Sequence, residues 1–135
     1  MRNPHLKRVG RWSAVIVILA LAGCAAAPVT EDSEKVVTER AKARLAALID
    51  GDVKLSYTFI SPASRQLYPW EVYRGGIRVG FWKSARVDKV RCPSAELCEV
   101  DVTVEYTFKG STVPSPLRES WTKQEGQWWY VLKNL

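Results

Sequence analysis

The sequence predicts an α+β domain in which N-terminal helices pack on a curved antiparallel sheet of about four strands. Two observations carry this prediction. Apolar residues recur at helical spacing in the first half of the chain, and an alternation of apolar and polar residues replaces that period after residue 77. Helices that precede a run of antiparallel strands are typical of the α+β class.

The first predicted helix follows Ser33, a residue suited to cap it, and ends at Gly51. Its apolar face is formed by Val37, Ala41, Leu45 and Leu48. Its polar side is assigned Lys35, Glu39, Lys42 and Arg44.

Two shorter helical segments are expected next. Asp52 is placed to cap a second helix, and Ser61-Pro62 opens a third, because proline is favoured at the first helical position. The helical part ends at Gly75-Gly76. The apolar face of the second helix is formed by Val53, Tyr57 and Ile60.

Two long strands are predicted over residues 81–92 and 99–108. The second alternates apolar and polar residues, so one of its faces is buried and the other is wet. Pairing Cys92 with Cys98 sets the register, and one extra residue at Asp88-Lys89 keeps the apolar residues together, which predicts a β-bulge there. The resulting pairs are Arg91–Glu99, Val90–Val100, Lys89–Asp101, Val87–Val102, Ala85–Val104, Ser84–Glu105, Lys83–Tyr106 and Phe81–Phe108.

The sequence after residue 108 predicts a loop followed by a second hairpin. Residues 109–116 contain prolines and are predicted as the loop. Residues 117–123 and 127–134 form the hairpin, joined near Glu125-Gly126. The last strand contains "WWYVL", which is apolar on both faces, and we therefore expect it in the centre of the sheet.

The N-terminus carries the pattern of an export signal. Four basic residues precede an uncharged apolar stretch at residues 14–23, and small residues follow it. The stretch is shorter than the roughly 20 residues that a transmembrane helix needs. Its end, Leu21-Ala22-Gly23-Cys24, resembles the lipobox of bacterial lipoproteins. The alternative is an ordinary signal peptide that happens to end at a core cysteine.

The lipobox resemblance implies cleavage before Cys24 and acylation of that cysteine. The chain would then comprise a signal peptide (1–23), a lipidated cysteine with its tether (24–32) and one domain (33–135). It would lie in the cell envelope, anchored in the lipid bilayer through Cys24 and facing the periplasm. Ala25 stands where the sorting pattern has Asp for inner-membrane retention, which favours the outer membrane.

Cleavage would also change the composition. Of the 135 residues it removes 23, including four of the 20 Lys and Arg and none of the 14 Asp and Glu, so the net charge falls from +6 to +2. Nucleic acid is therefore not an expected partner. The only histidine, His5, is also lost, which excludes histidine-based triads and histidine-ligated metals. No metal and no cofactor is expected.

Cys92 and Cys98 are predicted to form a disulfide. Exported compartments are oxidising, and the two cysteines are close in sequence. A C-x-x-C redox motif has a different spacing. Reduced thiols and an intermolecular bond are the alternatives.

The order of elements is similar to the nuclear transport factor 2-like superfamily, a cone-shaped α+β roll. The stretches that carry the resemblance are "IDGD" (49–52), "SPASR" (61–65) and "EGQWWYV" (125–131). A cystatin-type sheet on a single helix is the competing fold, and extended structure at residues 52–60 would favour it. The superfamily includes isomerases, dehydratases, small-molecule binders and assembly subunits, so the resemblance does not fix a function.

Two carboxylates are candidates for acid–base chemistry. Asp88 lies at the predicted bulge, and burial in an apolar cavity would raise its pKa as a general base requires. Glu119 alternates with Leu117 and Trp121, so it can face inward. The competing interpretation of Asp88 is a solvated carboxylate at the rim. Asp101 and Glu105 are expected to form solvated cross-strand pairs.

Aromatic residues are candidates for ligand or partner binding. Ligand pockets are largely apolar, so a cone lined by aromatic residues would suit an apolar ligand. Tyr68-Pro69-Trp70 is predicted as a loop at the rim. The candidate residues are Tyr57, Tyr68, Trp70, Trp82 and Trp121.

A basic run extends over residues 74–91 and is interpreted as a solvated strand face, with a membrane-facing contact as the alternative. Altogether the sequence favours a non-catalytic binding or assembly module of the envelope. Its partner would be another envelope protein or a second copy, docked on the outer sheet face or the 68–70 rim. The alternative is a cone that binds a small molecule, with weak carboxylate catalysis as an extension.

Overall fold

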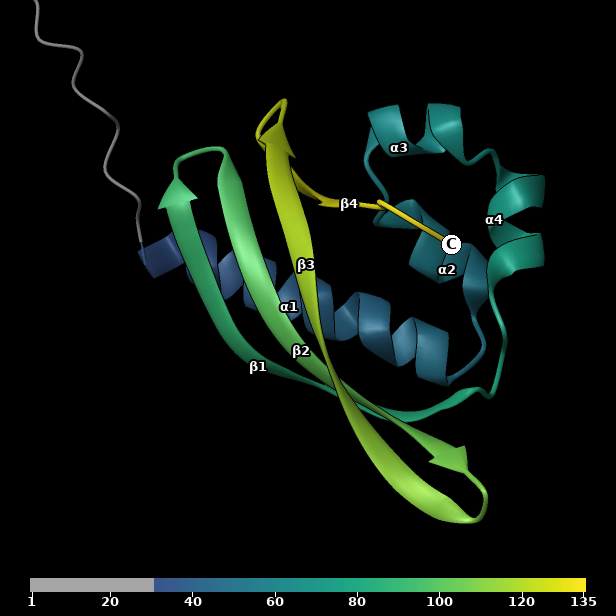
Figure 1. The fold of residues 1–135 in the computed structure, drawn as a ribbon. Coiled ribbons are helices and arrows are strands. Elements are labelled where there is room, and N and C mark those ends of the chain that lie inside the picture. The colour runs from purple at the N-terminus through teal and green to yellow at the C-terminus, as the bar shows by residue number, and fades with distance from the viewer. Residues whose placement is uncertain (1–30) are drawn as a thin grey trace, which may run out of the picture.

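The computed structural model describes residues 31–135, which form four helices and a four-stranded antiparallel sheet (Figure 1). The predicted α+β class is confirmed. Cys24 and the export signal lie outside the described residues. The helices are α1 (Glu31–Ile49), α2 (Val53–Thr58), α3 (Pro62–Leu67) and α4 (Trp70–Gly76). The strands, in their order across the sheet, are β1 (Trp82–Ser94), β2 (Leu97–Phe108), β3 (Ser111–Gln124) and β4 (Gln127–Val131).

Helix α1 lies across one face of the sheet, and α2 to α4 stand at one side of it (Figure 1). The helix begins at Glu31, three residues before Glu34, the predicted first residue, so Ser33 lies within the first turn and does not cap the helix as predicted. It stops where predicted, since Gly51 adopts a positive φ of 77°. The four residues of the predicted apolar face, Val37, Ala41, Leu45 and Leu48, are all buried.

The short helices begin at the predicted caps. The Asp52 carboxylate accepts a hydrogen bond from the backbone N–H of Leu55 (2.9 Å), and the Ser61 hydroxyl accepts one from that of Ser64 (3.1 Å). Residues 53–58 are helical, which argues against the cystatin-type alternative.

The predicted loop at 68–70 is shorter than expected. Tyr68 and Pro69 connect α3 to α4, and Trp70 is already the first residue of α4. The fixed φ of proline is pre-organised for a helix start, which keeps the connection short.

The predicted register of β1 and β2 is confirmed from Arg91–Glu99 to Ala85–Val104, including the bulge at Asp88. A second register shift, between Trp82 and Ser84, was not predicted. It places Trp82 opposite Tyr106, so the expected Lys83–Tyr106 and Phe81–Phe108 pairs are wrong. Phe81 instead precedes the strand and stacks on Tyr106, with the ring centroids 5.2 Å apart. The register shift bends the strand and keeps the rings of Phe81 and Tyr106 packed on each other.

The Cys92–Cys98 disulfide closes the turn between β1 and β2. Both cysteines are buried against α1, within the main hydrophobic core. The crosslink therefore fixes the end of the hairpin that lies beside the first helix.

Residues 109–116 form a tight turn and the start of β3 rather than a loop. The turn is Lys109-Gly110, where both residues have positive φ, and β3 begins at Ser111. Strand β4 pairs only with residues 120–124, so the preceding part of β3 is an edge. Pro114 and Pro116 are tolerated there because an edge strand does not need every N–H for pairing.

Strand β4 is the last strand of the sheet, not a central one as predicted. Its outer edge is covered by the chain between α2 and α3. The backbone N–H of Tyr130 donates to the Phe59 carbonyl (2.8 Å), and that of Ser61 donates to the Tyr130 carbonyl (2.8 Å). Trp128 faces the core, whereas Trp129 lies beneath the guanidinium groups of Arg40 and Arg65. The strand is apolar on both faces because both are covered.

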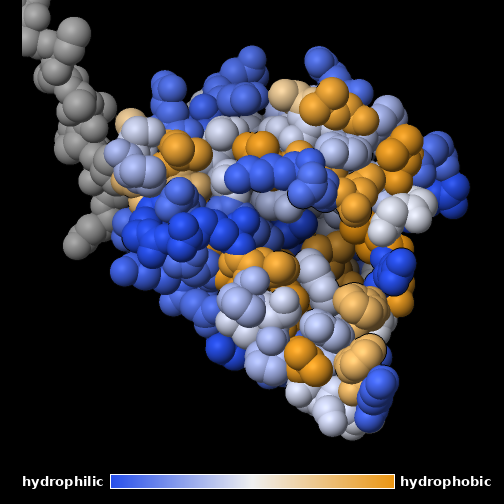
Figure 2. Space-filling model, viewed as in Figure 1, coloured by the Kyte–Doolittle hydropathy of each residue, from blue (hydrophilic) through white to orange (hydrophobic). Residues whose placement is uncertain are grey.

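The core has two parts. The larger lies between α1 and the sheet, and the smaller joins Ile60, Tyr73 and Leu132 at the side where α2 to α4 stand. The opposite face of the sheet is mostly hydrophilic (Figure 2). Among the helices of residues 31–135, none is both long and apolar enough to cross a membrane.

Candidate ligand pocket

A pocket of about 600 Å³ opens between the sheet and the α2–α4 side of the molecule. Figure 2 shows a hollow at this place, bordered by hydrophobic residues. The volume lies within the range typical of small-molecule sites. The lining residues are Arg44, Leu48, Tyr73, Gly75, Gly76, Ile77, Arg78, Phe81, Trp82, Tyr130, Leu132, Asn134 and Leu135.

A buried ion pair lies at the base of the pocket. Arg44 of α1 donates from Nη1 to Oε1 of Glu119 on β3 at 2.6 Å, and the two side chains are only 4% and 6% exposed. The second carboxylate oxygen, Oε2, accepts a hydrogen bond from the indole N–H of Trp121 at 3.0 Å. Glu119 is thus satisfied on both oxygens, as a buried carboxylate must be.

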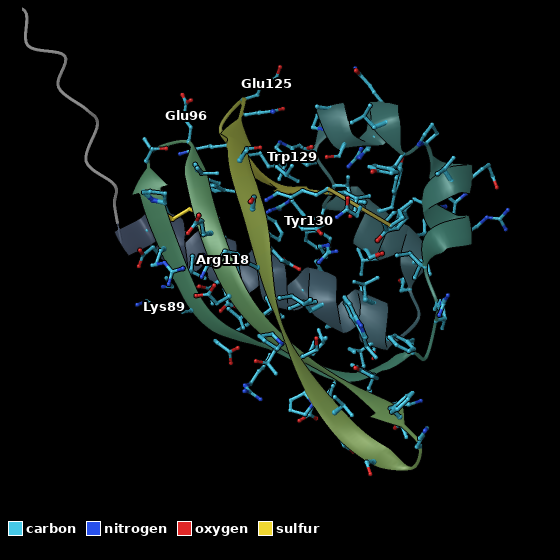
Figure 3. All side chains as sticks on the ribbon, viewed as in Figure 1. Lys89, Glu96, Arg118, Glu125, Trp129 and Tyr130 are labelled. Carbon is cyan, nitrogen blue, oxygen red and sulfur yellow. A yellow bond between two sulfur atoms is a disulfide. The ribbon has the colours of Figure 1, made fainter. Side chains whose placement is uncertain are left out.

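The guanidinium group of Arg44 also stacks on Tyr130. Its central carbon lies 3.6 Å from the centroid of the phenol ring, which is a close cation–π contact. Tyr130 lies on β4, on the side that faces the short helices (Figure 3). Burial raises the pKa of the Tyr130 hydroxyl, so this side chain stays protonated and can donate a hydrogen bond.

Arg44 keeps its charge in this setting. Burial by itself lowers the pKa of the guanidinium group, but the adjacent Glu119 carboxylate outweighs that effect and the pKa is raised. The Nε atom of Arg44 is buried and has no hydrogen-bond partner within residues 31–135. Arg44 therefore has donor capacity that the protein itself does not use.

The helical wall of the pocket is held by Tyr73. This residue is fully buried, and its hydroxyl shares a 2.9 Å hydrogen bond with Ser56, whose hydroxyl donates in turn to the Val53 carbonyl. The Tyr73 side chain is consequently held in the core, and this part of the pocket wall is fixed.

Of the five aromatic candidates from the sequence, the structure places only Trp82 in the pocket lining. Trp121 lies beneath it, fully buried against Glu119. Tyr57, Tyr68 and Trp70 form a separate cluster among the short helices. The Tyr57 hydroxyl donates to the Tyr68 carbonyl (3.2 Å), and its ring meets that of Trp70 edge-on at 5.5 Å.

The two candidate carboxylates are far from equivalent. Glu119 faces inward, as its alternation predicted, but Arg44 and Trp121 occupy both of its oxygens. Asp88 is exposed at the bulge and does not line the pocket. The Thr103 hydroxyl (2.6 Å), with help from Arg86 (2.7 Å), lowers the pKa of Asp88, which is opposite to the shift a general base needs.

The pocket residues that were not candidates from the sequence include Arg44, Tyr73 and Tyr130. The assignment of Arg44 to the polar side of its helix is wrong, because it lies seven residues after Val37 and four before Leu48, on the apolar stripe. That spacing was a signal in the sequence that could have identified Arg44. The sequence carries no such signal for its partners on β3 and β4, because these depend on tertiary packing.

The basic run is mostly a paired, solvated face. Arg74 pairs with Glu71, Arg86 with Asp88, and Arg91 with Glu99 and Asp101. Arg78, Lys83 and Lys89 form no ion pair with any described residue, and of these three only Arg78 lines the pocket. Within residues 31–135, no group of three or more His, Cys, Asp or Glu is placed to hold a metal ion.

The buried ion pair gives a stability prediction. We expect Glu119→Leu and Arg44→Met each to lower the free energy of unfolding by about 3–5 kcal/mol, because each leaves an uncompensated buried charge. The double variant should recover most of that loss. Urea denaturation of the four proteins measures the coupling. The exposed Glu39–Lys42 pair on the same helix is the control, and its removal should cost less than about 1 kcal/mol. Additive losses at Arg44 and Glu119 would show that the two residues do not act as a pair.

No protein-family profile matches the sequence, and no curated protein matches it. Solved structures do resemble it. A SEC-C motif containing protein from Rhodopseudomonas palustris superposes with a TM-score of 0.57 at 18% identity, over 69% of this chain and 73% of that one. A second SEC-C motif containing protein, from Psychrobacter arcticus, gives a TM-score of 0.59 at 11% identity, over 73% and 59% of the two chains.

A third similar structure is a Campylobacter jejuni protein described as an NTF2-like transpeptidase. Its TM-score is 0.50 at 14% identity, and the match covers 77% of this chain and all of that one. Identities this low show a shared fold and nothing about activity. N-terminal helices packed on a four-stranded antiparallel sheet, with an NTF2-like structure among its neighbours, is therefore the fold of this chain.

Proposed function

We propose that this chain is a lipid-anchored binding domain of the bacterial cell envelope, which holds a small and largely apolar molecule in its pocket. The observation that carries the proposal is the 600 Å³ hollow with aromatic walls and the buried Arg44 at its base. Apolar walls with a few fixed polar groups are the usual composition of a small-molecule site.

Binding without catalysis fits the chemistry of the lining. The side chains of the lining include no carboxylate, thiol or imidazole. Their ionisable groups are arginine, which does not deprotonate in proteins, and tyrosine, of which Tyr130 has its pKa raised further by burial. Neither group serves as a base near neutral pH.

The anchor rests on the lipobox at residues 21–24. Six residues separate Cys24 from the start of α1, and an extended chain spans at most about 3.3–3.6 Å per residue. An acylated Cys24 would therefore hold the domain within about 20 Å of the bilayer. We place it on the periplasmic face, in the outer membrane rather than the inner.

Assembly with another envelope protein, or with a second copy, is the second candidate function. The observation in its favour is a charged ladder across three strands on the outer sheet face. Asp101 of β2 accepts from Arg118 of β3 (2.8 Å) and pairs with Arg91 of β1 (3.0 Å). Such a ladder would fit a polar partner, whereas the pocket fits an apolar one.

A pocket-filling variant tests the leading proposal. Gly75 lines the pocket, and a Cβ atom built there meets no other atom within 4 Å, so Gly75→Phe would fill the hollow without a backbone clash. Native mass spectrometry of protein purified from membranes should show a small molecule bound to the wild type and lost from this variant. Ala43→Phe, at an exposed position of α1, is the control and should retain it. Equal occupancy in both variants would contradict the proposal.

The anchor has its own test. Mass spectrometry of the mature protein should find an N-terminal peptide that begins at Cys24 and carries acyl chains. Cys24→Ala should abolish both the cleavage and the acylation, while Ala27→Ser should preserve them. An N-terminal peptide with an unmodified Cys24 would rule out the lipid anchor and leave the pocket proposal untouched.

A further inference from the structure

The charge of the pocket lining is one-sided. Two guanidinium groups, Arg44 and Arg78, line the hollow, and no Asp or Glu does. The other side chains of the lining are apolar or neutral. Charges in a low-dielectric cavity act strongly on a ligand, so this lining favours a negatively charged group over a neutral or positive one.

Arg44 is prepared to bind such a group. Its side chain is 4% exposed, and the contacts with Glu119 and Tyr130 hold the guanidinium plane in place. Its Nε–H remains unpartnered although it is buried. A buried donor without an acceptor is costly. Because Arg44 lines the hollow, its guanidinium group can meet the acceptor atoms of a ligand there.

The balance of charge indicates one negative charge on the ligand. Glu119 already compensates Arg44 from below, whereas Arg78 is exposed and has no carboxylate within 4.0 Å among residues 31–135. The site therefore retains about one uncompensated positive charge. A monoanion matches this charge, and a dianion would leave one negative charge unpaired in the pocket.

The remaining walls define the body of the ligand. Trp82, Phe81 and Tyr130 contribute aromatic surface to the lining, and Phe81 and Leu135 are about half exposed at 45% and 48%. An apolar body would bury surface on these rings that water now covers.

We propose, building on the binding function above, that the ligand is an amphipathic monocarboxylate. Its carboxylate lies between Arg44 and Arg78, and its apolar body lies along Trp82, Phe81 and Tyr130. Planar guanidinium groups match the geometry of a carboxylate, which distinguishes this head group from a hydroxyl. The apolar body is an alkyl chain or an aryl group, since either can pack against the aromatic side chains of the lining.

Isothermal titration of the full chain in phosphatidylcholine nanodiscs tests this, with empty nanodiscs as the blank. The probes are 4-phenylbutyrate, 4-phenylbutanol and 4-phenylbutylamine, which differ only in their head groups. We expect the carboxylate to bind at least about tenfold more tightly than the alcohol, and the amine to bind more weakly than both. Decanoate compared with 4-phenylbutyrate then separates an alkyl from an aryl body.

Variants assign the preference to the two arginines. Arg78→Gln should reduce the ratio of carboxylate to alcohol affinity by at least about threefold, and the double variant Arg44→Met/Glu119→Leu should reduce it by a similar factor, because Arg78 remains in place. Arg74→Gln is the control, because Arg74 lies nearby on α4 but pairs with Glu71 and does not line the pocket. It should leave the ratio unchanged.

The outcomes separate this inference from the proposed function. Equal affinity of the carboxylate and the alcohol, with both lost in Gly75→Phe, would overturn the monocarboxylate and keep the binding pocket. Binding that Gly75→Phe does not change, or no binding of any probe, would overturn the pocket itself.

Discussion

The ion pair between Arg44 and Glu119 joins the first helix to the third strand in the middle of the fold. It determines the environment of several neighbours at once. Trp121 finds its acceptor on Glu119, and Tyr130 packs against both the guanidinium group and the indole of Trp121. Replacing such a pair with apolar residues is often neutral or stabilising, so its stability contribution alone does not explain it. The ligand site that we propose gives the pair a role, as a fixed cationic donor at the base of an apolar pocket.

The pocket lies between the sheet and the α2–α4 side of the molecule, beside this ion pair. Strand β1 carries two irregularities between its disulfide end and the pocket. The bulge at Asp88 and the shift between Trp82 and Ser84 bend the strand and bring Trp82 into the lining. At the other end of β1 the Cys92–Cys98 disulfide holds the hairpin beside α1. The strand is therefore fixed at one end and bent at the other, where the site lies.

Much of the fold could be predicted from local signals. Gly51, Asp52 and Ser61 mark helix ends through backbone geometry and capping that depend on a few neighbouring residues. The cysteine pair and the alternation of β2 sufficed for most of a register, including its bulge. The predictions were wrong where the structure of a segment depends on parts of the chain that are distant in sequence. Strand β4 is apolar because the core covers one face and the side chains of Arg40 and Arg65 cover Trp129 on the other. Pro114 is tolerated because β4 is too short to reach it.

The site was harder to predict than the fold for the same reason. Arg44 lies on the apolar stripe of its helix, but only packing shows that Glu119, 75 residues later, faces it. The most direct measurement is NMR of the arginine Nε–H groups in the full chain, with Arg40, whose Nε–H donates to the Trp128 carbonyl, as an internal reference. If Arg44 is a ligand-binding donor, its Nε–H signal will shift on addition of 4-phenylbutyrate and stay in place with 4-phenylbutanol, while the Arg40 signal does not move. An Arg44 signal that is unchanged at saturating carboxylate would contradict the account.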